Sequence, residues 1–582
     1  MKKFTFLFLL VLIGVWSASG QAEVKLKYRF SQDATYARDM DMNKGDADNP
    51  VATRGNLAGN TLGNGSGDSY YFFSSLLGVN ALWAPLSNTE VLADLVAQFD
   101  WHGSNGTVFP QQTAIPGQAV GTYPNTGSTT AIGFGFKELN LKLTDFFDFP
   151  VDLKVGRQDI KLGRGFIVDS WIVGAGGAPY ENGRGPSGSG AAAGAGRNGQ
   201  HTGANTGNLP INATSPGSLY APEKSAFDAF DAVTARVHFD KLNIDLGYAL
   251  IASAFSEADY GTALGGTRSD REIATADNEH LSFFNVGYTW DKVFSGLLTE
   301  AYFVYNLDDE PTVDRQVTTA GIESAKVYTL GGRGDWNWGK GFLGFKNVNT
   351  YVEGAYQLGK LGGDNTDSAL GRKRRGYAAN LGSDFSLDST SKWLPSLFKL
   401  EAIVLSGEGP GGLEDDDATA TGGLNDVGSG NPWGGWDWQF MGPAFWYAKI
   451  MPFLDLFYLT DVLAPPGDST TAPIMGKHDA GLTNRAVLRA KADFEWTKKL
   501  FLSLNAAYAT AMQLPQAGLK PSQKKFGQEL DWDLVYKLSK VTDLTFDGGV
   551  LFPGSYYKRI PNTGRRTPAT YLLRLGFKVD LG

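Results

Sequence analysis

The chain contains no cysteine among its 582 residues. This absence excludes disulfides, thiolate metal sites and cysteine nucleophiles. Histidine is scarce as well, because only five occur and none has the spacing of metal ligands. No serine lies in the sharp strand-to-helix turn of a hydrolase nucleophile. We therefore expect no enzyme: no catalytic residue, no cofactor and no bound metal.

An excess of positive charge is also missing. Lys and Arg number 52 against 61 Asp and Glu, which gives a net charge of −9. A nucleic-acid-binding protein would usually carry a basic patch and a high isoelectric point. The balance of charge therefore argues against nucleic acid as a partner.

Long hydrophobic runs are absent from the body of the chain. A membrane-spanning helix needs about 20 apolar residues. The nearest such stretch, residues 443–464, is interrupted by Lys449, Asp455 and Asp461. The sequence therefore does not predict a helical membrane protein.

The N-terminus has the three parts of a secretory signal. Lys2 and Lys3 precede an uncharged run of 13 residues, 4–16, and small residues follow as far as Ala22. The run is too short to span a membrane as a helix. We expect cleavage after Ala22, with cleavage after Gly20 as the alternative, so that residues 1–22 are a signal peptide and residues 23–582 form a single domain.

What the chain does contain is long stretches of alternating polarity. In residues 24–30 every second side chain is apolar, and the positions between are Lys25, Lys27 and Arg29. Side chains alternate faces along a strand, so one face is apolar and the other charged. Such stretches run about 10 to 13 residues, the length of a tilted membrane-spanning strand rather than a globular one. The pattern predicts an all-β, transmembrane antiparallel β-barrel. A soluble β-sandwich, with shorter strands, is the alternative.

Eighteen such segments can be counted, and single-chain bacterial barrels have an even number of strands. They cover residues 24–30, 71–83, 89–101, 131–143, 151–162, 228–239, 242–252, 281–290, 297–307, 327–338, 346–358, 377–387, 397–406, 485–496, 500–511, 528–538, 543–552 and 570–581. Short connections alternate with long ones, as expected for periplasmic turns and extracellular loops. Residues 443–464 could add two strands to make 20, but we interpret them as a folded loop segment.

Two motifs carry a resemblance to a known family. Gly156-Arg157-Gln158, followed by Gly163-Arg164-Gly165, resembles the Gly-Arg-Gln strand motif of the alginate export family. Gly527-Gln528-Glu529-Leu530-Asp531 and then Phe552-Pro553-Gly554 resemble the closing strands of that family, although Gln528 stands where a small polar residue or His is expected. The resemblance is specific over residues 151–165 and 526–556. It implies an 18-stranded outer-membrane barrel that passes an anionic polyuronate outwards.

A wide barrel encloses water unless loops block it, and the inward charges then determine selectivity. Strand alternation predicts a basic wall where the first and last strands meet, and an acidic wall beside it. By the alternation of side chains along its strand, Arg157 would face outward. It is included among the pore-lining residues because of the family resemblance. The predicted pore-lining residues are Lys25, Lys27, Arg29, Lys154, Arg157, Arg236, Arg333, Arg485, Arg489, Lys491, Glu529, Asp531, Asp533, Asp547, Arg574 and Lys578.

Two functional classes follow from this pattern. The first is an outer-membrane porin, a channel for anionic solutes or for an oligosaccharide or polysaccharide. The second is a structural barrel, plugged by its loops, that serves a partner such as an extracellular redox protein or an adhesin. We expect a monomer surrounded by outer-membrane lipid. The sequence leaves open whether residues 163–227 or 407–484 occlude the lumen, and whether acidic residues at 39–48 and 414–417 bind calcium.

Overall fold

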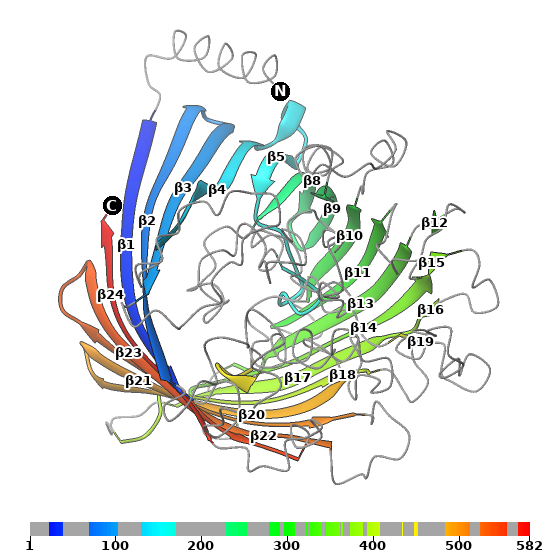
Figure 1. Ribbon diagram of the computed structural model, residues 1–582. Coiled ribbons are helices and arrows are strands. Elements are labelled where there is room, and N and C mark those ends of the chain that lie inside the picture. Colours follow the sequence, from blue (N-terminus) through cyan, green and yellow to red (C-terminus); the bar gives the residue numbers. More distant parts are fainter. Residues whose placement is uncertain are drawn as a thin grey trace, which may run out of the picture.

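A computed structural model shows the chain as a closed antiparallel barrel (Figure 1). The predicted signal peptide and both acidic loop clusters lie outside the residues that the structure describes. Those residues are 23–38, 69–102, 130–169, 229–252, 279–290, 296–308, 322–323, 325–339, 342, 345–360, 363–364, 373–387, 393–407, 433–434, 447–451, 484–512, 524–555 and 569–581.

Eighteen long strands form the wall. They are β1 (Glu23–Arg38), β2 (Ser69–Leu86), β3 (Thr89–His102), β4 (Thr130–Leu143), β5 (Val151–Gln158), β8 (Phe230–Phe239), β9 (Leu242–Ala252), β10 (Glu279–Trp290), β11 (Leu297–Asp308), β13 (Ala325–Asn337), β14 (Asn347–Lys360), β17 (Tyr377–Ser386), β18 (Leu397–Leu405), β20 (Arg485–Thr497), β21 (Leu500–Ala511), β22 (Lys525–Lys537), β23 (Thr542–Pro553) and β24 (Thr570–Leu581).

Shorter elements accompany the wall. They are the 3₁₀ turn η2 (Phe146–Asp148) and the two-residue strands β6 (Lys161–Leu162), β7 (Val168–Asp169), β12 (Ile322–Glu323), β15 (Gly363–Asp364), β16 (Lys373–Arg374) and β19 (Trp433–Gly434). No helix among the described residues is long and apolar enough to cross a membrane.

The ring closes between the two ends of the chain. β1 pairs with β2 along its whole length and with β24 from Tyr28 opposite Leu581 to Arg38 opposite Tyr571. Figure 1 shows blue β1 beside red β24. All eighteen wall strands fall on the segments predicted from alternation, so the predicted fold class is confirmed.

Two boundaries differ most from the prediction, and several others differ by one to three residues. β1 continues to Arg38, because β2 offers it a partner beyond the alternating stretch. The predicted strand 151–162 ends at Gln158, opposite Phe230 at the start of β8. Gly156 has a φ of +117°, a conformation that residues with a Cβ rarely adopt. The chain then leaves the wall, and β6 pairs with β7 instead.

Burial is inverted relative to a soluble protein. Leu530 is 53 % exposed on the outside of β22, whereas its neighbours Glu529 and Asp531 are 0 % and 3 % exposed on the inside. Leu488 is 63 % exposed near the start of β20. A continuous outward apolar surface is stable against lipid hydrocarbon, and a closed barrel leaves no unpaired strand edge there. The protein is therefore an outer-membrane β-barrel.

Candidate functional site: a charged constriction inside the barrel

Charged side chains on the inner face pair across neighbouring strands. Arg236 Nε lies 2.5 Å from Asp245 Oδ1, and the two residues are opposite each other in the β8–β9 register. Arg333 on β13 donates to Glu300 Oε2 on β11 at 2.8 Å, again across a register pair. Directly opposite positions on one face bring side chains together. The inner face is therefore lined by compensated pairs rather than by one sign of charge.

The wall that the sequence predicts to be basic has this mixed character too. Lys25 and Lys27 are exposed, and alternation along β1 places them on the same face of the strand as Arg29. Other predicted lumen cations have carboxylates within ion-pair distance: Arg29 with Asp94 at 2.9 Å, Lys154 with Glu138 at 3.8 Å, Lys491 with Asp493 at 3.3 Å and Lys578 with Asp580 at 2.8 Å.

Arg157 lies on the outer face of the wall. It is opposite Asp231 in the β5–β8 register, and its NH1 is 3.5 Å from the Asp231 carboxylate. Its Nε donates to the backbone carbonyl of Phe136 at 2.9 Å. Exposed Val155, two residues earlier, has the same parity. Arg157 is therefore not brought to the lumen with the other predicted residues. Gln158 faces inward in its place, and its amide donates to the Ala232 carbonyl at 2.8 Å.

Residues 160–169, here called the Arg164 arm, turn into the barrel after β5. Their apolar side chains Ile160, Leu162, Phe166, Ile167 and Val168 are buried. Figure 1 shows this cyan part of the chain inside the ring. The arm reaches β13 and β14, which are separated from β5 in the wall by β8 to β11. It therefore crosses part of the lumen.

The tip of this arm is held by three contacts. The Arg164 backbone N–H donates to Glu353 Oε2 at 3.0 Å, and its NH1 donates to Asp335 Oδ1 at 3.3 Å. The guanidinium carbon lies 3.7 Å from the centroid of the Tyr351 ring, a cation–π distance. Sequence reasoning did not place Arg164 among the lumen residues, although it lies in the Gly163-Arg164-Gly165 motif that carries the family resemblance.

A second segment, residues 447–451, docks on β22 and β23, another part of the wall, and is here called the Lys449 arm. Backbone N–H groups of Lys449 and Ile450 donate to Glu529 Oε1 at 2.8 and 2.6 Å, and that of Met451 donates to Oε2 at 2.7 Å. One carboxylate thus satisfies three consecutive amides. The arm forms no wall strand, in keeping with the interpretation of residues 443–464 as a folded loop segment; the rest of that stretch is outside the described residues.

The Lys449 side chain fastens this arm to the acidic wall. Its Nζ lies 2.5 Å from Asp533 Oδ1 and 2.8 Å from Asp547 Oδ2. Burial lowers the pKa of the Lys449 ammonium, but Asp547 and Asp533 raise it by more, so the pKa lies above its ordinary value. Lys449 therefore remains a cation at neutral pH and compensates both carboxylates.

Five of the predicted pore-lining residues are covered rather than exposed to water. Arg485 and Glu529 are 0 % exposed, Arg574 2 %, Asp531 3 % and Asp547 5 %. They lie beneath the Lys449 arm or pair with one another. Arg485 NH1 donates to Tyr447 Oη at 2.7 Å, and Arg574 NH2 lies 2.8 Å from Asp547 Oδ2. Alternation along a strand predicts which face a side chain is on. It cannot predict that the Lys449 arm covers these residues, because the arm is distant from their strands in sequence.

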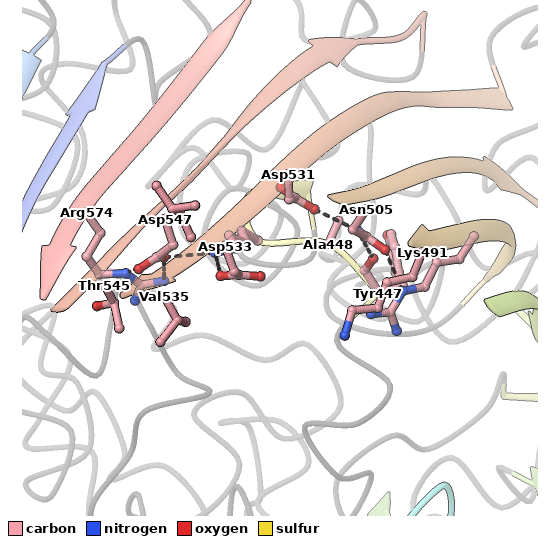
Figure 2. Close-up of a pocket in the computed structure, with 13 residues that line it drawn as sticks. Tyr447, Ala448, Lys491, Asn505, Asp531, Asp533, Val535, Thr545, Asp547 and Arg574 are labelled. Carbon is pink, nitrogen blue, oxygen red and sulfur yellow. Dashed lines mark hydrogen bonds and ion pairs between the residues drawn. The ribbon is translucent and has the colours of Figure 1, made fainter. Parts of the chain in front are cut away.

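A cavity of about 360 Å³ remains between the Lys449 arm and the wall. Figure 2 shows Lys491, Asn505 and Tyr447 on one side of it, and Asp533, Asp547 and Arg574 on the other. Arg489 also contributes to its lining. Asn505 links the two sides, since it accepts from Arg489 Nε at 2.7 Å and donates to Asp531 Oδ2 at 2.7 Å. The site can therefore contact a solute with donors on one side and acceptors on the other.

One group of described residues has the composition of a metal site. Ligand atoms of Asp145, Asp152 and His238 lie within 4.8 Å of one another near the turn between β4 and β5. Lys142 Nζ is 3.7 Å from Asp152 Oδ2, so a cation of the chain already compensates one of these carboxylates. His238 Nε2 lies 3.5 Å from Asp145 Oδ1, so members of the group also contact one another.

Comparison with known proteins gives distant structural similarity only. No family model matches the chain, and no curated protein is similar to it in sequence. OccAB1 of Acinetobacter baumannii has 8 % identity and a TM-score of 0.44, covering 97 % of each chain. OccK5 (OpdH) of Pseudomonas aeruginosa has 10 % identity and a TM-score of 0.39, covering 96 % of this chain and 98 % of that one. A BenF-like porin from Pseudomonas fluorescens Pf-5 has 9 % identity and a TM-score of 0.41, covering 97 % and 99 %.

These likenesses are too distant to assign a family or a substrate. The alginate export family is not shown by any of them, so that resemblance remains an expectation from two motifs.

Proposed function

We propose that the protein is an outer-membrane channel for small solutes that carry a carboxylate group. The observation that carries this proposal is the cavity on the inner face of the wall, which Arg489 and Lys491 help to line. Conduction requires binding that is weak enough for the solute to leave. Arg489 and Lys491 each have a carboxylate partner within the protein, which competes with a bound solute. The outward apolar surface and the charged interior are the arrangement of a channel in lipid.

The two arms favour small solutes over a polymer. The Arg164 arm contacts β13 and β14, and the Lys449 arm contacts β22 and β23, so both occupy space that a polysaccharide chain would need. Export of an alginate-like polyuronate would require at least one arm to leave its carboxylate partners. A monomer is sufficient for the proposed channel, because one barrel encloses the whole cavity.

Anion preference is expected to come from Arg489 and Lys491. Both lie on the inner face of β20, and their side chains are 15 % and 32 % exposed. A unit charge about 8 Å from a permeating ion in water changes its energy by about 0.5 kcal/mol, which is about twofold in relative permeability. Each of the two charges acts on cations and anions in opposite directions, so the paired substitution combines four such factors and should change the permeability ratio by about tenfold or more.

Recording in planar bilayers under a salt gradient tests the proposal. The purified protein should give ohmic current, and its reversal potential should have the sign expected for a channel that prefers anions to cations. Arg489→Gln combined with Lys491→Gln should shift the reversal potential toward the cation value. Arg157→Gln, which removes an outer-face cation, is the matched control and should leave it unchanged. Absence of current from correctly folded protein would contradict the proposal and would favour a plugged barrel that serves a partner protein.

A further inference from the structure

We propose that the cavity beneath the Lys449 arm selects solutes that carry both a carboxylate and an ammonium group, and not simple anions. This inference rests on the proposed channel function and names the substrate class of the same site. It comes from the arrangement of charge around the cavity. Arg489 and Lys491 lie on one side, on β20, and exposed Asp533 lies on the other, on β22. The cations on the acidic side, Lys449 and Arg574, are already paired with Asp533 and Asp547.

The cationic side has unused donors. Arg489 donates from Nε to Asn505, and its NH1 is 3.4 Å from Glu401 Oε2, while its NH2 group has no partner among the described residues. Lys491 has one ion pair within the described part of the chain, with Asp493 on its own strand. Residues two apart on a strand share a face and lie about 7 Å from each other. The two side chains can therefore converge on one carboxylate.

The acidic side has an unused acceptor. Asp533 contacts Lys449 through Oδ1, but Oδ2 has no partner among the described residues. Its side chain is 46 % exposed, whereas Asp531 and Asp547 on the same side are 3 % and 5 % exposed and therefore covered. Asp533 is thus the carboxylate that a positively charged group in the cavity would meet.

The dimensions of the cavity match a small zwitterion. β20 and β22 are separated by β21, so their backbones are about 10 Å apart, and the side chains shorten that distance from both sides. A volume of about 360 Å³ lies at the lower end of the range for small-molecule sites. Asn505 stands between the two sides and bonds to both, which further limits the size of a polar ligand there.

Three probes of similar size separate the alternatives: 4-aminobutyrate, butyrate and butylammonium. Each is added to the full protein conducting in a planar bilayer, and the concentration that interrupts half of the current is measured. A charge-assisted hydrogen bond is worth about tenfold or more in affinity. We expect 4-aminobutyrate to act at a concentration about tenfold below that of either single-charge probe.

Variants then assign each end of the probe. Asp533→Asn should remove the advantage of 4-aminobutyrate over butyrate and leave block by butyrate intact. Arg489→Gln with Lys491→Gln should weaken block by butyrate and leave block by butylammonium intact. Tyr447→Phe loosens the arm without changing a charge in the cavity. It should change the blocking concentrations of all three probes by the same factor.

The outcomes distinguish this inference from the proposed function. If current flows but butyrate blocks as well as 4-aminobutyrate, the channel stands and the selection of zwitterions is overturned. The selection is equally overturned if Asp533→Asn shifts all three probes by the same factor, because that is the effect of a displaced arm. If no current flows, the proposed function itself fails.

Discussion

At the scale of single residues, Lys449 contacts two carboxylates that belong to neighbouring strands of the wall. Asp533 is on β22 and Asp547 is on β23, and the two are opposite each other in register. Without a cation between them these acids would repel one another. Lys449, from a distant part of the chain, therefore compensates the acidic wall together with Arg574, which pairs with Asp547.

Replacing Lys449 by Met should release the arm and increase the single-channel conductance. The substitution removes both ion pairs of the arm: Asp547 keeps Arg574, but half-exposed Asp533 is left without an ion-pair partner among the described residues. Breaking a fully buried pair costs about 3–5 kcal/mol, which is an upper bound for this partly exposed one. Three backbone hydrogen bonds to Glu529 are not expected to hold the arm against that cost. Conductance in planar bilayers is the measurement.

Lys498→Met is the control, since Lys498 is exposed in the turn between β20 and β21. An unchanged conductance in the Lys449 variant would mean that the arm does not limit the pore.

Alternation along the strands is sufficient to place single charges on the inner face. Glu529, Asp531 and Asp547 are inward by parity, and they are inward in the structure. Parity could not pair them with Lys449, because the arm lies 80 residues from Glu529 in sequence and has no periodic pattern. Arg157 shows where a motif misleads. The family motif predicted that it faces the lumen, whereas alternation along its strand predicted the outer face, and the structure agrees with alternation.

At the scale of elements, the strands are the part of the fold that local sequence determines well. Apolar and polar residues alternate wherever one face meets lipid and the other meets water, so each strand carries its own signal. The two arms carry none, because they are fixed by contacts across the lumen. β5 ends at Gln158, and the Arg164 arm that follows has a similar composition. The sequence therefore does not mark where the wall ends and the arm begins.

Gly163 gives a test of how firmly the Arg164 arm is built in. It has a φ of +58°, and a Cβ placed on it would clash with Glu353 Oε1. Gly163→Ala therefore adds backbone strain of about 1–2 kcal/mol and a clash with the carboxylate that holds the arm. We expect the arm to detach and the conductance in planar bilayers to rise.

Gly339→Ala is the matched control. Gly339 also has a positive φ, +77°, but nothing lies within 4 Å of the position of its Cβ. Equal conductance changes in the two variants would show that strain alone, and not the contact with Glu353, is responsible.

At the scale of the whole molecule, the wall separates lipid outside from water inside. The wall strands contribute one apolar and one polar face, and closure between β1 and β24 makes the separation continuous. The arms, the cavity and the proposed selectivity have a role only if water fills the enclosed space.

The absence of cysteine makes this separation directly measurable, because single cysteines can be introduced without a background signal. Cysteines would replace Leu488 and Lys491 on β20, and Leu530 and Asp533 on β22, one residue at a time. A charged, water-soluble thiol reagent is then added during recording in a planar bilayer. We predict that the current changes for Lys491→Cys and Asp533→Cys and stays constant for Leu488→Cys and Leu530→Cys. Modification at the two leucine positions, or at all four alike, would contradict the separation of lipid and water by this wall.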